Sequence, residues 1–221
     1  MIKYNISYKL PHRHLVDFEL SALTNGMKKM QFQLSAWRPG RYELADFAQN
    51  IINWQAYDDK GEELHFKKIT KDLWEVDCIE TKEITVIYNF YANQLDAGAC
   101  YLDEYQLYLN PVHCMFYIVD RMEEEYQLNM NIPENYKIAS SMLKNGNTLN
   151  VKGYDLLAES PIICSSNIQH DIYQVESIDF HIWFQGECKP DWGKLKKDFT
   201  AFTKSQIKKF GAFPVDEYHY F

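Results

Sequence analysis

The feature that most constrains the fold of this chain is an alternation of apolar and polar residues that begins at its first residues. In the segment Ile2–Tyr8 every second side chain is apolar, which places those side chains on one face of an extended strand. Similar short segments recur along the sequence, and turn-forming pairs such as Asn25-Gly26 separate them. Many short alternating strands with turns between them predict a mainly β protein, an antiparallel β-sandwich.

The later strands are expected from the same pattern. The 16 Tyr and 13 Phe residues support this, because aromatic side chains favour strands over helices. We predict strands at His14–Leu23, Met30–Trp37, Asn53–Asp58, Leu64–Ile69, Leu73–Ile79, Glu83–Ala92, Tyr126–Met130, Lys137–Ser140, Thr148–Lys152, Ile168–Val175 and Phe180–Phe184.

The pattern changes at Lys189-Pro190. Asp191 is a suitable N-cap for a helix that starts at Trp192, and Gly211 is a suitable residue to end it. Because this one long helix follows an all-β region, we divide the chain into a β-sandwich domain over residues 1–188 and the start of a second domain over residues 189–221. A strand begins at Tyr218–Phe221, so we expect the natural protein to continue past Phe221.

Charge and cysteine content exclude several classes of protein. The net charge is −8 and the only lysine-rich segment lies within the predicted helix, so we expect no nucleic-acid partner. No apolar stretch approaches the about 18 residues of a membrane helix, and the first residues lack the apolar core of a secretory signal. The five cysteines show no C-x-x-C spacing, which favours free thiols and a cytoplasmic location.

A search for catalytic motifs finds none. The sequence has no H-E-x-x-H, no G-x-S-x-G and no phosphate-binding glycine loop, so we predict no catalytic residue and no metal ligand in this chain. His12 and His14 would share one face of a strand and form a weak metal candidate, but two ligands alone favour ordinary hydrogen-bonded histidines. Cys100 and Cys114 flank His113, and a buried, unreactive thiol is the commoner role.

The run Trp37–Ile51 combines a tight turn with aromatic anchors. Pro39 fixes its own φ angle and Gly40 accepts a positive φ, which predicts a tight turn after a strand. We expect Tyr42, Phe47 and Ile51 to anchor the following short segment onto the sandwich.

As a whole, this run resembles the amino-terminal domain of the glycyl aminopeptidase family of zinc metallopeptidases. The matching residues are Trp37, Pro39, Gly40, Tyr42, Asp46, Phe47, Ala48, Asn50 and Ile51. Further segments that are similar, in the same order as in the family, are Pro11–Leu15, Leu73–Val76, Val86–Asn93, Ala99–Glu104, Leu109-Asn110, Tyr154–Ile162 and Phe210–Pro214 with Tyr218. Arg41 and Ala45 depart from the family pattern.

The resemblance implies a β-rich domain that precedes a thermolysin-like zinc domain and a PDZ domain. By that pattern residues 189–221 are the opening helix and first strand of the thermolysin-like catalytic domain. The zinc ligands then lie beyond Phe221, so this chain holds no cofactor of its own and is inactive alone. Its partners would be its own catalytic domain and the peptide substrate. The domain would cover the active-site cleft and help to bind the free amine of the peptide, for which the candidate residues are Tyr101, Asp103, Glu104 and Asn110.

Two alternatives remain open from the residues. The chain can be a stand-alone β-sandwich that binds carbohydrate or peptide, since five Trp and many Tyr suit stacking on a ligand. It can also be a small enzyme that uses Cys or His, although no nucleophile-and-base signature supports this.

Overall fold

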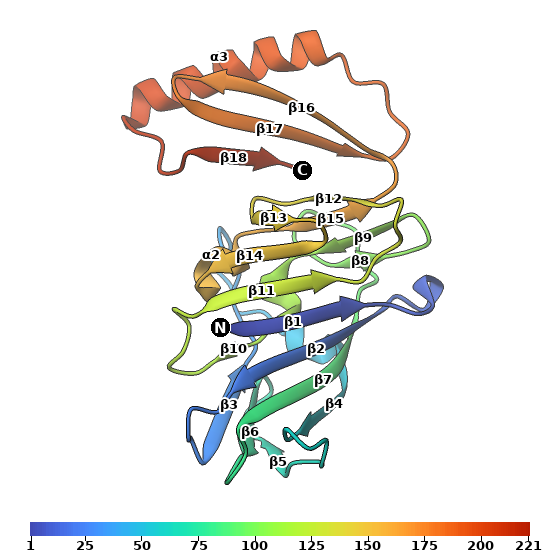
Figure 1. Ribbon diagram of the computed structural model, residues 1–221. Coiled ribbons are helices and arrows are strands. Elements are labelled where there is room, and N and C mark those ends of the chain that lie inside the picture. Colours follow the sequence, from blue (N-terminus) through green and yellow to red (C-terminus); the bar gives the residue numbers. More distant parts are fainter.

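The computed structural model describes residues 1–221 and divides into two stacked parts (Figure 1). The larger part contains a seven-stranded sheet. Its strands, in spatial order, are β13 (Leu143–Asn145), β14 (Thr148–Lys152), β11 (Glu125–Met130), β1 (Ile2–Ser7), β2 (Leu15–Leu23), β7 (Glu83–Tyr91) and β4 (Ile51–Tyr57).

Two four-stranded sheets complete this part. One contains, in order, β10 (Tyr117–Ile118), β3 (Lys29–Gln33), β6 (Leu73–Asp77) and β5 (Phe66–Lys68). The other contains β12 (Lys137–Ala139), β15 (Ile162–Ser165), β9 (Gln106–Leu109) and β8 (Tyr101–Leu102). Short helical segments connect the strands: η1 (Pro11–Arg13), η2 (Phe47–Asn50), α1 (Pro111–Cys114) and α2 (Tyr154–Ala158).

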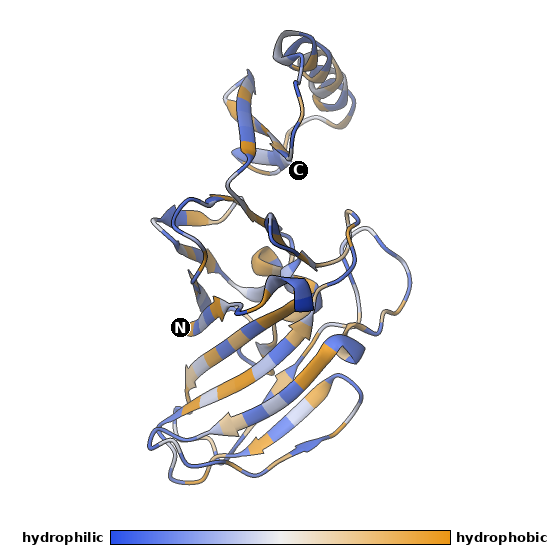
Figure 2. Cartoon of the chain, turned by 90° about the vertical axis from the view of Figure 1, so that its right-hand side faces the viewer, coloured by the Kyte–Doolittle hydropathy of each residue, from blue (hydrophilic) through white to orange (hydrophobic).

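The predicted alternation is what builds the core of this part. In Figure 2 the strands of the large sheet carry hydrophobic and hydrophilic residues in alternation, and along β1 every second residue, beginning with Ile2, is fully buried. The buried side chains of all three sheets form one cluster of 41 residues. The predicted β fold is therefore confirmed, and a single hydrophobic core holds residues 2–164 together.

Two buried tyrosines attach helix α1 and the residues after it to the large sheet. The Tyr4 hydroxyl accepts a hydrogen bond from the Phe116 backbone N–H at 2.7 Å and lies 3.1 Å from the Phe116 carbonyl, to which it donates. The Tyr88 hydroxyl donates to the Cys114 carbonyl at 2.6 Å. These bonds satisfy backbone groups that burial would otherwise leave unpaired, and they fix the position of α1.

Not every strand pair is antiparallel. β1 pairs with β11 in parallel, with Ile2 opposite Tyr126. The turn at Asn25-Gly26 is present, with positive φ at both residues, but it leads from β2 in one sheet to β3 in another and forms no hairpin. A turn motif predicts a reversal of the chain and not the sheet that the next strand joins.

The smaller part has its own core. It contains β16 (Ile168–Val175), β17 (Ile178–Gln185) and β18 (Glu217–Tyr220), which form one sheet, and helix α3 (Trp192–Phe210). The core of this part consists of Tyr173, Val175, Ile178, Phe180, Ile182 and Ile207. The change of core thus falls near residues 166–168, whereas the domain boundary expected from the sequence lies after Cys188. The hairpin β16–β17 alternates like the preceding strands, so the sequence pattern alone assigns it to the sandwich.

Helix α3 begins and ends where the sequence predicts. The Asp191 carboxylate accepts a hydrogen bond from the Lys194 backbone N–H at 3.0 Å, and Gly211 follows the last turn with a φ of 92°. None of the helices in the structure is both long and apolar enough to span a bilayer.

Candidate functional site

A polar cavity of about 170 Å³ lies between η2 and the segment that follows β7. It is the candidate site because two stretches of the sequence that resemble the peptidase family meet there. Its polar lining comes from Arg41, Asp46, Gln49, Asn50, Gln94, Asp96 and His113, and its apolar lining includes Phe47 and Phe90.

His113 occupies the inner wall of the cavity. It lies on α1, which begins directly after Asn110 with Pro111 at its first position, where the missing N–H of proline costs no hydrogen bond. The imidazole stacks on the ring of Phe47, with centroids 3.7 Å apart and planes inclined by 21°. His113 is buried, and its Nε2 atom has no hydrogen-bond partner.

Burial, followed by the charge of Arg38, keeps this imidazole neutral. The pKa of His113 is lowered to about 4, mainly by burial. The positive charge of Arg38 lowers this pKa more than the carboxylate of Asp96 raises it. The Asp96 carboxylate accepts hydrogen bonds from the Gly98 backbone N–H at 2.7 Å and from the Gln94 side chain. These bonds, the one from Gly98 first, lower the pKa of Asp96. The cavity therefore combines a fixed carboxylate with a neutral ring nitrogen.

Gly98 allows Arg38 to reach this site. A Cβ atom at position 98 would lie 0.9 Å from Nη1 of Arg38, so the guanidinium rests directly against the glycine backbone. Only a residue without a side chain permits this approach.

Two buried thiols lie at or near the cavity, and Cys100 is part of its lining. Cys100 and Cys114 are both buried, and their sulfur atoms lie 3.7 Å and 3.5 Å from the Asn110 carbonyl oxygen. Burial raises the pKa of Cys114 well above its ordinary value, so its thiol stays protonated and unreactive. The arrangement can hold a polar group or a cation.

The four predicted amine-binding residues do not form one cluster. Asn110 is buried behind the cavity wall, where its amide donates to the Ala99 carbonyl at 2.6 Å and to the Tyr108 hydroxyl at 3.1 Å. Its polar hydrogens are thus used within the fold. Tyr101, Asp103 and Glu104 lie in β8 and the β8–β9 turn, outside the cavity lining.

Asp103 has a structural role in that turn. One of its carboxylate oxygens accepts hydrogen bonds from the backbone N–H groups of Tyr105 and Gln106 at 2.8 Å and 2.9 Å. Glu104 is exposed, and its carbonyl accepts a hydrogen bond from the Tyr136 hydroxyl at 2.9 Å. Its carboxylate makes no hydrogen bond or ion pair within the chain.

The Trp37–Ile51 run behaves only in part as predicted. The turn is present: Gly40 has a φ of 75°, and the Arg41 N–H donates to the Arg38 carbonyl at 3.2 Å. Phe47 packs against the core, and Ile51 packs there too. Tyr42, however, is fully exposed, so the prediction that it anchors the run is wrong. Its short loop projects from the sandwich, and spacing alone does not reveal this.

The remaining family-motif residues take ordinary positions beside this loop. Trp37 is partly exposed, with 39% of its surface accessible, and Pro39 occupies the turn. Asn50 ends η2 and lines the cavity.

His12 and His14 do not share a strand face. Residues Pro11–Arg13 form the short helix η1, and His14 follows it in the left-handed region, with a φ of 56°. The His14 Nδ1 atom lies 2.6 Å from the Leu102 carbonyl. The proline ahead of His12 starts a helical turn, which removes the period-2 geometry that a shared metal would need.

The structure also brings together three residues that the sequence does not single out. His181 on β17 lies beside Glu217 and His219 on β18. No spacing motif identifies this cluster, because it depends on the parallel pairing of two strands that the long helix α3 separates in sequence.

Solved structures of peptidases share this fold. An aminopeptidase N family protein from Idiomarina loihiensis superposes with a TM-score of 0.89 at 23% identity, covering 99% of this chain and 38% of that one. An M1 zinc metallopeptidase from Deinococcus radiodurans superposes with a TM-score of 0.51 at 12% identity, covering 99% of this chain and 54% of that one. The chain thus spans about two fifths to about half of these proteins. No curated protein matches the sequence.

The sequence itself matches a family model. The model that describes the peptidase M61 N-terminal domain covers residues 3–166, which end where the core of the sandwich ends. This agrees with the resemblance drawn from the Trp37–Ile51 run and its companions. The chain belongs to the peptidase M61 N-terminal domain family.

Proposed function

We propose that residues 1–166 form the non-catalytic amino-terminal domain of a zinc-dependent aminopeptidase. In this proposal the domain covers the cleft of a catalytic domain and contributes to binding the amino terminus of the peptide. The observation that carries it is the family match over residues 3–166. The same match favours this function over a stand-alone carbohydrate- or peptide-binding module.

Residues 168–221 would open the catalytic domain. Two facts support this: they pack around a core of their own, and the similarity to the two solved peptidases covers 99% of the chain, so it continues past residue 166. The zinc would be bound outside these 221 residues, since the sequence has no H-E-x-x-H. Zinc bound in such enzymes lowers the pKa of a water molecule to about 7 and polarises the scissile carbonyl.

The free amine of the peptide would be bound by carboxylates. An ammonium group donates three hydrogen bonds and prefers charged acceptors. Of the four candidates, Glu104 and Asp103 are best suited, because the Glu104 carboxylate is exposed without a partner and only one Asp103 oxygen is committed to the turn. Asn110 and Tyr101 would position this segment.

Kinetics of the full-length enzyme test this role. Glu104→Ala and Asp103→Asn should raise KM for peptides with a free amino terminus and leave kcat nearly unchanged. Glu134→Ala removes another exposed carboxylate and serves as the control. If neither variant changes KM, the amine-binding role is wrong, although the domain assignment would stand.

The natural reading frame tests the domain assignment. We expect an H-E-x-x-H motif and a later Glu downstream of Phe221. A stop codon directly after Phe221 would contradict it. We further propose a cytoplasmic location, in keeping with the five free cysteines, four of which are buried.

A further inference from the structure

One face of the small sheet carries a cluster of histidines. Phe180 and Ile182 of β17 belong to the core that packs against α3, so His181 between them points to the opposite face. β17 pairs with β18 in parallel, which places His181 opposite His219. Glu217 precedes His219 by two residues on β18 and therefore shares its face.

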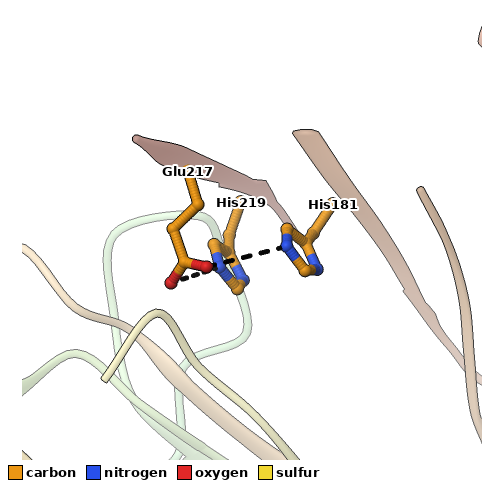
Figure 3. Close-up of side chains that lie close together, drawn as sticks. All are labelled: His181, Glu217 and His219. Carbon is orange, nitrogen blue, oxygen red and sulfur yellow. Dashed lines mark ion pairs between the residues drawn. The ribbon is translucent and has the colours of Figure 1, made fainter. Parts of the chain in front are cut away.

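The three side chains converge (Figure 3). The imidazoles of His181 and His219 stack with centroids 4.2 Å apart and planes inclined by 4°. The Glu217 carboxylate lies 3.9 Å from Nε2 of His181 and 3.5 Å from Nε2 of His219. In a tetrahedral site with bonds of about 2.0 Å, ligand atoms lie about 3.3 Å apart. The ligand atoms of the three residues lie within 4.8 Å of one another, so binding one ion would require the side chains to move closer and one of the two parallel rings to turn.

One nitrogen of the cluster is buried without a partner. The His219 side chain is 6% exposed, and its Nε2 atom, which faces the Glu217 carboxylate, makes no hydrogen bond. The His181 side chain is 15% exposed, whereas that of Glu217 is 51% exposed. Buried polar atoms are nearly always paired, so a buried nitrogen that faces a carboxylate at 3.5 Å without a hydrogen bond leaves room for a ligand between the two groups.

Neighbouring side chains hold the two rings. His170 on β16 places its Nε2 atom 3.0 Å from Nδ1 of His181, which leaves Nε2 of His181 free to face Glu217. Such contacts fix the ring orientation of histidine ligands in metal sites.

The contact from Trp183 opposes metal binding. Its indole N–H donates to Nδ1 of His219 at 3.0 Å. An indole can only donate, so the neutral His219 ring carries its proton on Nε2. A metal at Nε2 would move that proton to Nδ1, where it would face the indole N–H. The bond from Trp183 and a bond to a metal therefore compete.

From this geometry we propose that His181, Glu217 and His219 form a binding site for a divalent transition metal of the zinc class, with solvent completing the coordination. Two imidazoles and one carboxylate are a ligand set that suits zinc. This site is separate from the zinc of the proposed peptidase centre, which would lie outside these residues.

Cobalt and zinc titrations of the 221-residue chain test the proposal, after a chelator has been used and removed. We expect one equivalent of Co²⁺ to give the visible bands of a low-coordinate site and Zn²⁺ to displace it. His181→Ala, His219→Ala and Glu217→Gln should each weaken binding at least about tenfold. His12→Ala removes an exposed histidine outside the cluster and should change nothing.

Trp183→Phe separates this site from an adventitious one. Phenylalanine keeps a ring against His170, on which Trp183 stacks at 3.7 Å, but it removes the competing N–H donor, so the metal should bind more tightly. Glu217 is half exposed, so Glu217→Gln should not change the thermal unfolding temperature measured without metal. A loss of metal binding in this variant therefore cannot be due to misfolding. The proposal would be overturned if the chain bound no cobalt. It would also be overturned if the Glu217→Gln and His181→Ala variants still bound one equivalent of Co²⁺ as tightly as the wild type.

Discussion

The ring of Phe47 stacks on the imidazole of His113 at a centroid distance of 3.7 Å. Phe47 lies in the run that resembles the peptidase family, and His113 lies on α1, which the Tyr88 hydroxyl attaches to the large sheet. The contact therefore links the loop at residues 37–46 to the core of the sandwich. It also buries the histidine that defines the cavity.

Phe47→Ala should destabilise the sandwich. Removing a buried phenylalanine costs about 3–5 kcal/mol, and because Phe47 is only half-buried we expect about 2 kcal/mol. Urea unfolding measures the change. Tyr42→Ala in the neighbouring exposed loop is the control and should stay within about 0.5 kcal/mol of the wild type. Equal losses for both variants would contradict the packing described here.

The stability of the sandwich should depend on pH through His113. The folded-state pKa is about 4 and the unfolded value is about 6.5, so the unfolded state binds the proton more readily. The free energy of unfolding is highest above a pH of about 6.5, where His113 is neutral in both states. It decreases as the pH falls from about 6.5 towards 4, and below that it no longer changes through His113. The total loss is about 3 kcal/mol.

His113→Gln isolates this effect. Unfolding free energies of the wild type and of this variant should diverge between about pH 4 and pH 6.5, with the wild type losing more as the pH falls. Parallel curves for the two proteins would show that His113 titrates normally.

Gly98→Ala should displace Arg38, because the new methyl group would occupy the place of its guanidinium. The far end of an arginine moves easily, so we expect a stability change under about 1 kcal/mol. Loss of the positive charge should raise the pKa of His113, which an NMR titration of the imidazole measures. Gly193→Ala, in helix α3, is the matched control. An unchanged His113 pKa in Gly98→Ala would mean that Arg38 has no electrostatic effect there.

Tyr4→Phe should cost about 1–3 kcal/mol, because it leaves the buried N–H of Phe116 without an acceptor. Thermal or urea unfolding gives the value. Tyr105 is exposed, and Tyr105→Phe should be neutral. A neutral Tyr4→Phe would imply that another group, such as a water molecule, satisfies this N–H.

The sequence predicts the parts of the fold that local chemistry decides. The caps of α3 at Asp191 and Gly211, the turn at Gly40 and most strands follow from residue type and spacing. The short strands β8, β9, β10, β13 and β15 and the short helices α1 and α2 are too brief to produce a periodic signal. They form because the sheets and the core around them supply their partners.

The sites depend on pairings that the sequence does not encode locally. His181 and His219 meet only because β17 and β18 pair in parallel. Phe47 and His113 meet because two short helices far apart in the sequence, η2 and α1, lie side by side. The same limitation explains Tyr42, since an aromatic residue beside a turn is equally compatible with a buried anchor and with an exposed loop tip. The sequence gives the residue types at these sites, but it does not predict which residues contact one another there.

Aminopeptidase assays of two forms of the protein test the central claim most directly. The full-length natural protein should hydrolyse peptides with a free amino terminus, lose that activity to a chelator and regain it with zinc. The 221-residue chain should show no hydrolysis under the same conditions. Hydrolysis by the 221-residue chain that persists in chelator, or a full-length protein without peptidase activity, would contradict the assignment of this chain as the non-catalytic amino-terminal domain of a zinc aminopeptidase.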